Sequence, residues 1–117
     1  MNKKHLQLLE WVGKLKICEK VIIVEGIKDK RALEKLGIEN VMSLKKSLYK
    51  VAEDMAKLEK ECIILTDFDK KGKELYKKLK EGLDKEGVKV DKFFREWLRK
   101  HTKLSHIEGL FAYVNNA

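Results

Sequence analysis

Apolar and polar positions follow two rhythms along this chain, one typical of helices and one typical of buried strands. Between residues 4 and 16, apolar side chains such as Leu8, Val12 and Leu15 recur at helical spacing among charged residues, which predicts a helix. The same spacing returns in residues 29–36, 47–60 and 71–86. Continuous apolar runs at residues 21–24 and 62–65 instead predict strands that are covered on both faces.

Weaker patterns complete the predicted fold. Residues 38–44 and 88–94 are expected to be strands, and residues 95–114 a helical region in which Ser105 and Glu108 have the spacing of a capping box. Because strands alternate with helices, the sequence predicts an α/β fold with about four mostly parallel strands covered by helices on both faces. No linker or repeat divides residues 1–117, so we expect a single domain.

Acidic residues follow the two strongly apolar strands. Glu25 comes directly after the first, and Asp67 and Asp69 follow the second. Residues two apart in an extended segment point to the same side, so the two aspartates are expected to lie close together. Such carboxylates favour a hard divalent cation, Mg²⁺ or alternatively Mn²⁺. If the two strands are neighbours, Glu25 reaches the same edge of the sheet and becomes a third metal ligand.

The residues around these acids support the site but also allow a simpler explanation. Gly26 permits a tight turn, and Gly72 leaves room at the start of the next helix, whose N-terminus favours an anion. Asp69 and Asp29, however, could each be a helix N-cap instead of a ligand. Other sites are excluded, because Lys78 stands where an EF-hand requires glutamate, no P-loop motif occurs, and the histidines lack zinc-site spacing.

The net charge of +8 indicates a polyanionic partner. The 27 basic residues outnumber the 19 acidic ones, which favours a nucleic-acid partner, RNA or DNA. A chain rich in Lys and Glu that lacks proline is also typical of a thermophile's surface. Four lysines border the acidic residues and are candidate contacts to nucleic acid, although lysines on a helix face are usually only solvated: Lys28, Lys70, Lys71 and Lys73.

The remaining composition indicates where the protein works. No apolar run is long enough to span a membrane and no signal peptide is recognisable, so we expect a cytoplasmic protein without membrane contact. Its two cysteines belong to no ligand pattern and are expected to be small hydrophobic residues in a reducing compartment. Four aromatic residues are expected in the core, and their exposure would instead indicate base stacking or a homodimer contact: Phe93, Phe94, Trp97 and Phe111.

Two motifs resemble the Toprim family. Residues 21–26, Val-Ile-Ile-Val-Glu-Gly, are similar to the family's first strand with its glutamate, and Asp29 completes an E-G-x-x-D pattern. Residues 66–72, Thr-Asp-Phe-Asp-Lys-Lys-Gly, resemble the family's D-x-D strand end. The resemblance covers about residues 19–95. It implies a Rossmann-like sheet, Mg²⁺ bound by Asp67 and Asp69, and Glu25 as general acid or base or as a metal ligand.

Departures from the family pattern argue against a topoisomerase or a primase. Lys71 replaces the third acid of type II topoisomerases, and no further region supplies a nucleophilic tyrosine domain or a primase core. The resemblance is therefore to small stand-alone Toprim proteins, nearest in motif to ribonuclease M5, although Ile27 replaces a lysine favoured there. We expect Mg²⁺-dependent, nuclease-like cleavage of structured RNA or DNA. Two alternatives stay open, a non-catalytic metal- and nucleic-acid-binding module of a larger complex and a phosphohydrolase of small nucleotides.

Overall fold

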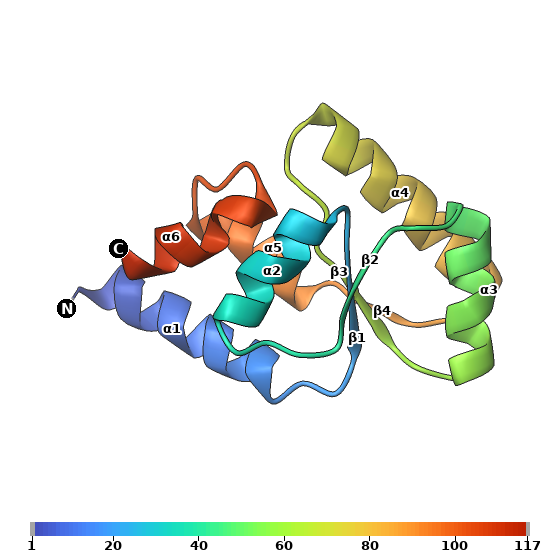
Figure 1. Ribbon diagram of the computed structural model, residues 1–117, viewed down its shortest axis with the longest axis horizontal. Helices are drawn as coiled ribbons and strands as arrows, with labels where there is room; N and C mark the ends of the chain where they lie inside the picture. The colour runs from blue at the N-terminus through green and yellow to red at the C-terminus, as the bar shows by residue number, and fades with distance from the viewer. Residues whose placement is uncertain (1, 117) are drawn as a thin grey trace.

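Four short strands form one parallel sheet at the centre of the molecule (Figure 1). The computed structural model describes residues 2–116. The strands lie in the order β2-β1-β3-β4, and Ile22 of β1 pairs with Val41 on one side and with Ile63 on the other. The strands are β1 (Val21–Val24), β2 (Val41–Ser43), β3 (Cys62–Ile64) and β4 (Val90–Asp91).

Helices cover both faces of this sheet, as Figure 1 shows with one layer on each side of the strands. One layer consists of α1 (Lys3–Lys16), α2 (Ile27–Lys35), α5 (Phe93–His101), the short 3₁₀ helix η1 (Ile107–Gly109) and α6 (Leu110–Asn115). The other layer consists of α3 (Leu48–Leu58) and α4 (Lys70–Lys85). The predicted α/β class and parallel, doubly covered sheet are confirmed.

Alternation along the strands divides the core into two clusters. Ile22 and Ile63 pack toward the layer that contains α1, whereas Ile23 and Ile64 pack toward α3 and α4. All four are almost completely buried, so each side chain stabilises the fold by ~1.5–3 kcal/mol relative to an exposed one. The apolar runs in the sequence are therefore strands with a helix layer on each face.

The structure corrects the sequence prediction around the fourth strand. Of the predicted strand over residues 88–94, only Val90 and Asp91 pair with β3, because the Phe93 backbone N–H donates to Asp91 Oδ1 at 2.9 Å and α5 begins there. Phe93 is consequently 47% exposed, so its placement in the core was wrong, whereas Phe94 is buried. The predicted capping box at Ser105 is also wrong, since the 3₁₀ helix begins at Ile107 without a side-chain cap.

The chain leaves β1 and β3 in opposite directions. From β1 it crosses to β2 through α2 on one face, and from β3 it crosses to β4 through α4 on the other face. The carboxyl ends of β1 and β3 therefore form the switch point at which parallel sheets bind ligands. Among residues 2–116, no helix has the length and apolarity that crossing a membrane requires.

Candidate metal centre

Glu25 and Asp67 meet at this switch point. Glu25 directly follows β1, and Asp67 lies in the loop that links β3 to α4. Glu25 Oε1 accepts a hydrogen bond from the Asp67 backbone N–H at 3.0 Å. The structure thus brings the predicted glutamate to the edge of the sheet that carries the aspartates, because β1 and β3 are neighbours.

Both aspartates are held by backbone N–H groups. Asp67 Oδ1 accepts from the Ile107 N–H at 2.8 Å, and Asp69 Oδ1 accepts from the Gly72 N–H at 2.8 Å. Asp69 is the N-cap of α4, as its sequence position allowed. Glu25 and Asp67 each use one oxygen in this way, so their second oxygen remains for a further partner, whereas the second oxygen of Asp69 faces His106.

His106 is a site residue that the sequence did not indicate. Its Nε2 lies 3.3 Å from Asp69 Oδ2. Ligand atoms of Asp67, Asp69 and His106 all lie within 4.8 Å of one another, and Glu25 is not part of this group. Two oxygens bound to one Mg²⁺ at ~2.1 Å are at most ~4.2 Å apart, so a small contraction would let this group bind one ion. Local sequence gave no signal for His106, because packing of η1 brings it to the aspartates.

Gly72 lets the Asp67 backbone lie directly on the first turn of α4. A Cβ atom at Gly72 would be 2.9 Å from the Asp67 Cα and closer still to its carbonyl group. The Thr66 hydroxyl donates to the Gly72 carbonyl oxygen at 2.8 Å and holds the loop from its other side. The room that the sequence predicted at Gly72 is therefore filled by the acidic loop itself.

Arg95 holds the same loop through a hydrogen bond to its backbone. Its side chain is buried, and Nη2 donates to the Asp67 carbonyl oxygen at 2.8 Å. The guanidinium lies between the rings of Phe68 and Tyr76, 4.7 and 4.6 Å from their centroids. Burial lowers the pKa of Arg95, and cation–π contact with both rings offsets part of the cost of burying the charge. The sequence did not indicate this residue, because its contact with Asp67 depends on how α5 packs against the loop.

The electrostatic environment raises the pKa of two carboxyl groups. Burial raises the pKa of Glu25, and the charges of Asp67, Asp29 and Asp69 add to the effect, although the hydrogen bond from Asp67 N–H opposes it. Burial likewise raises the pKa of Asp29. Asp29 is not the N-cap of α2, because Gly26 occupies that position and donates its N–H to Asp29 Oδ2 at 3.0 Å.

The four predicted lysines lie on the two helices that begin at the acidic residues. Lys28 is in the first turn of α2, and the first turn of α4 carries Lys70, Lys71 and Lys73. All four side chains are exposed. Their contact with nucleic acid stays a prediction.

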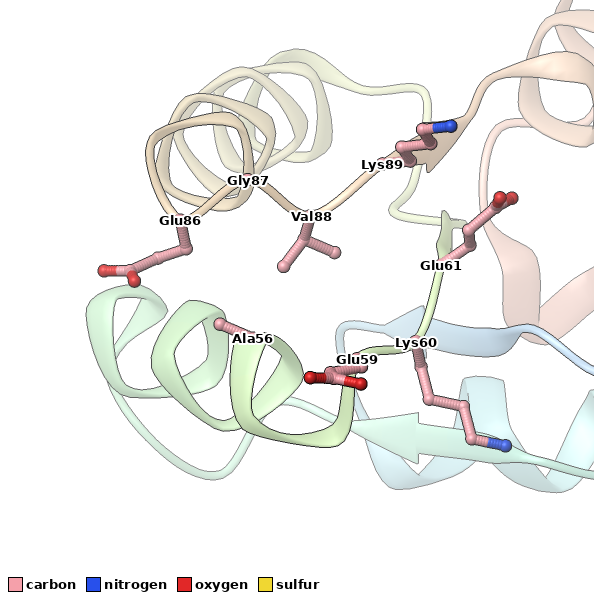
Figure 2. Close-up of a pocket in the computed structure, with 8 residues that line it drawn as sticks. All are labelled: Ala56, Glu59, Lys60, Glu61, Glu86, Gly87, Val88 and Lys89. Carbon is pink, nitrogen blue, oxygen red and sulfur yellow. The ribbon is translucent and has the colours of Figure 1, made fainter.

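A hollow of about 340 Å³ lies at the opposite edge of the sheet from these residues (Figure 2). It is bounded by the segments that lead into β3 and β4, with Glu59, Glu61, Glu86 and Lys89 at its rim. Glu86 extends to one side of the hollow and Glu61 and Lys89 to the other, so these side chains do not converge on a common point (Figure 2). The hollow contains none of the predicted site residues and has no convergent polar groups typical of a binding site.

Comparisons with known proteins assign the family. The Toprim domain model matches residues 19–94. The UPF0292 protein MJ1624 of Methanocaldococcus jannaschii is 41% identical over 116 residues, which cover 93% of this chain and 91% of that protein. A UPF0292 protein of Thermococcus sibiricus is 40% identical over 114 residues, which cover 94% of this chain and 88% of that protein. A solved structure, a putative protein from Aquifex aeolicus, is 41% identical with a TM-score of 0.78, covering 86% of this chain and 95% of that one. This chain therefore belongs to the Toprim domain family and is a relative of the UPF0292 proteins.

Proposed function

We propose that this protein binds a divalent ion, Mg²⁺ or Mn²⁺, at Asp67 and Asp69 and cleaves phosphodiester bonds in structured RNA or DNA. The observation that carries the proposal is the way the carboxylates are held. Each of Glu25, Asp67 and Asp69 accepts one backbone N–H with one oxygen, which orients the side chain, and the other oxygen of Glu25 and of Asp67 is left for a ligand. The other oxygen of Asp69 faces His106, a member of the same group of candidate ligands. Ligands oriented in advance by surrounding hydrogen bonds are typical of metal sites.

The residues divide the chemistry between them. Asp67 and Asp69 hold the ion, and when bound it supplies positive charge against the charge that develops on the phosphate. Glu25 lies beside them, and its pKa is raised by burial toward the range in which a carboxyl group exchanges protons efficiently. Glu25 is therefore the residue that takes a proton from the attacking oxygen or returns one to the leaving oxygen. Lys28 and the lysines of the first turn of α4 hold the backbone phosphates.

A second candidate function is metal and nucleic-acid binding without cleavage, as a module of a larger complex. The observation that favours it concerns Asp69. Its Oδ1 caps α4 and its Oδ2 faces His106, so both oxygens already have partners within the protein. An aspartate that is satisfied in this way contributes to stability with or without a metal ion.

Divalent-ion binding is the first measurement. We expect Mn²⁺ binding, followed by electron paramagnetic resonance or calorimetry, to be lost in Asp67→Asn and in Asp69→Ser. Serine keeps an N-cap for α4 but removes the carboxylate, so Asp69→Ser separates the ligand role from the structural one. Asp84→Asn makes the same chemical change at an exposed position of α4 outside the proposed site and is expected to leave binding unchanged.

Cleavage is the second measurement. Labelled structured RNA and DNA are incubated with the protein in Mg²⁺ or in EDTA. Cleavage that requires the metal and is lost in Asp67→Asn and Glu25→Gln supports the enzyme. Metal-dependent binding without any cleavage favours the second candidate, and failure of the parent protein to bind a divalent ion overturns both.

A further inference from the structure

A groove of about 340 Å³ lies between α2 and the segment formed by η1 and α6, outside the candidate metal centre. We call it the α2–α6 groove. It is lined by Lys28, Arg31, Lys35, Glu108, Phe111 and Ala112. Its two walls differ in chemistry. Every basic residue comes from α2, whereas the opposite wall consists of an acidic, an aromatic and a small residue, Glu108, Phe111 and Ala112.

The basic wall is a single stripe along α2. Lys28, Arg31 and Lys35 are separated by three and four residues, which places them on one face of the helix. All three are exposed, and within residues 2–116 none of them forms an ion pair. The other two arginines are engaged elsewhere, since Arg95 is buried and Arg99 pairs with Glu96 at 2.9 Å. Arg31 is thus the arginine that remains for an external anion.

The opposite wall offers a ring instead of charge. Phe111 of α6 is only partly buried, and Lys35 Nζ lies 5.6 Å from its ring centroid. An aromatic ring beside cations that follow a groove is the combination with which proteins bind unpaired nucleotides, the ring stacking on a base and the cations on phosphates. Glu108 repels phosphate from this wall, and its carboxylate can accept a hydrogen bond from an amino group of a base. The two walls therefore give a strand one orientation, with phosphates toward α2 and bases toward α6.

One end of the groove adjoins the metal centre. Residues of η1 contact both, because the Ile107 N–H holds Asp67 and the next residue, Glu108, lines the groove. At the other wall, Lys28 stands three residues after Glu25. From Lys28 to Lys35 the helix rises ~10 Å, at ~1.5 Å per residue, which matches about three stacked nucleotides at ~3.4 Å each.

We propose that the α2–α6 groove binds a single-stranded segment of nucleic acid of about three nucleotides that leads to the acidic residues. This inference rests on the proposed function for its direction, since it makes the groove the path along which the substrate reaches the metal centre. It adds Arg31, Lys35 and Phe111 as substrate-binding residues. It also specifies the substrate, a structured nucleic acid with an unpaired stretch next to the bond to be cut.

Binding is measured by fluorescence anisotropy in EDTA, so that neither metal binding nor cleavage contributes. The probes are single-stranded RNA, single-stranded DNA and the duplex of the same sequence. We expect both single strands to bind more tightly than the duplex, and the affinity ratio of RNA to DNA to show which of the two the groove prefers. Arg31→Gln and Lys35→Gln are each expected to weaken binding and to lower the slope of log affinity against log salt by about one.

Phe111→Leu tests the aromatic wall because it removes the ring but keeps an apolar side chain. It is expected to weaken binding of single strands roughly tenfold while leaving the salt slope unchanged, because stacking is lost and charge is not. Arg99 is an arginine on the surface of α5, outside the groove, so Arg99→Gln is the matched control. This variant should bind the single strands as tightly as the parent protein does. Melting temperatures measured beside each titration show that the variants are folded.

The outcomes separate this inference from the proposed function. If Arg31→Gln and Phe111→Leu bind all three probes as tightly as the parent protein, the groove is not the path, even where metal binding and cleavage are intact. A preference for the duplex overturns the single-stranded assignment. If the variants weaken single-strand binding but the parent protein binds no divalent ion, the groove assignment stands and the proposed cleavage fails.

Discussion

The substitution Gly72→Ala tests how closely the backbone of the acidic loop packs against α4. In a helix interior alanine is normally favoured over glycine by ~1 kcal/mol. At Gly72 the added methyl group would instead overlap the carbonyl group of Asp67. The Asp67 backbone cannot simply move aside, because Arg95 and Glu25 hold it by hydrogen bonds to its carbonyl and N–H. Overpacking costs ~1–3 kcal/mol, and a fixed backbone puts this case at the upper end of that range.

The same substitution at Gly82, further along α4, is the matched control. A Cβ atom there would lie 3.5 Å from the Ala52 Cβ, which is an ordinary contact. We expect Gly82→Ala to stabilise the protein by ~0.5–1 kcal/mol and Gly72→Ala to destabilise it by ~2 kcal/mol net. At ~4 °C per kcal/mol for a domain of this size, the melting temperatures should move by about +3 and −8 °C.

Circular dichroism melting curves in EDTA, followed by Mn²⁺ titration, test both parts of the reasoning. Gly72→Ala is expected to melt lower and to bind Mn²⁺ more weakly, since the displaced Asp67 carries a proposed ligand. Gly82→Ala should melt higher with unchanged Mn²⁺ affinity. A Gly72→Ala protein that melts at or above the parent temperature would refute the argument, because the loop backbone would then be free to yield.

Three further predictions concern charges around the loop and the sheet. Arg95→Met keeps an apolar stem but leaves the Asp67 carbonyl without its donor, so denaturant unfolding should show a loss of ~1–3 kcal/mol; no loss would mean that relief of the buried charge compensates. Because the folded-state pKa of Glu25 is raised, its ionisation opposes folding above that pKa. Metal-free Glu25→Gln should therefore melt higher than the parent protein at pH 7, and the difference should shrink as the pH falls and Glu25 becomes protonated. Partial burial raises the pKa of Asp91, but the hydrogen bond from Lys20 at 2.8 Å, the hydrogen bond from the Phe93 N–H and the charge of Lys20 together outweigh it and leave that pKa below its ordinary value. Asp91 thus stabilises the fold above about pH 4, so Lys20→Met should melt lower at neutral pH, with the gap closing in acid; a gap that persists in acid would assign the effect to packing.

The strands and their acidic ends were predictable because their information is local. Runs such as residues 21–24 and 62–65 are short and apolar at every position, a pattern typical of a strand covered on both faces. The placement of Glu25 and Asp67 then follows from the rule that ligands gather at the carboxyl ends of parallel strands. The fourth strand was overextended because Val88 to Phe94 is rich in apolar residues, whereas the Asp91 side chain captures the Phe93 N–H and starts a helix.

The residues that the sequence missed reach the site through tertiary packing. Arg95 contacts Asp67 across 28 positions, and Ile107 contacts the same aspartate across 40. No periodicity within one segment records such a contact, because the partner depends on how α5 and η1 pack against the sheet. His106 was set aside for lack of zinc-ligand spacing, yet the neighbouring Ile107 N–H anchors it next to Asp69.

The hydrogen bond from Ile107 to Asp67 also has a consequence during synthesis. The ribosome adds ~5–20 residues per second, so Asp67 and Asp69 emerge seconds before the backbone group that orients the first of them. The hydrogen bond of Phe68 is delayed by about as much, since its N–H donates to the Ser105 carbonyl oxygen. A nascent chain that stops before Ile107 has all of the acidic residues of the D-x-D loop but lacks the restraint that orders them. The divalent-ion affinity that we propose should therefore arise late in translation, only when η1 docks.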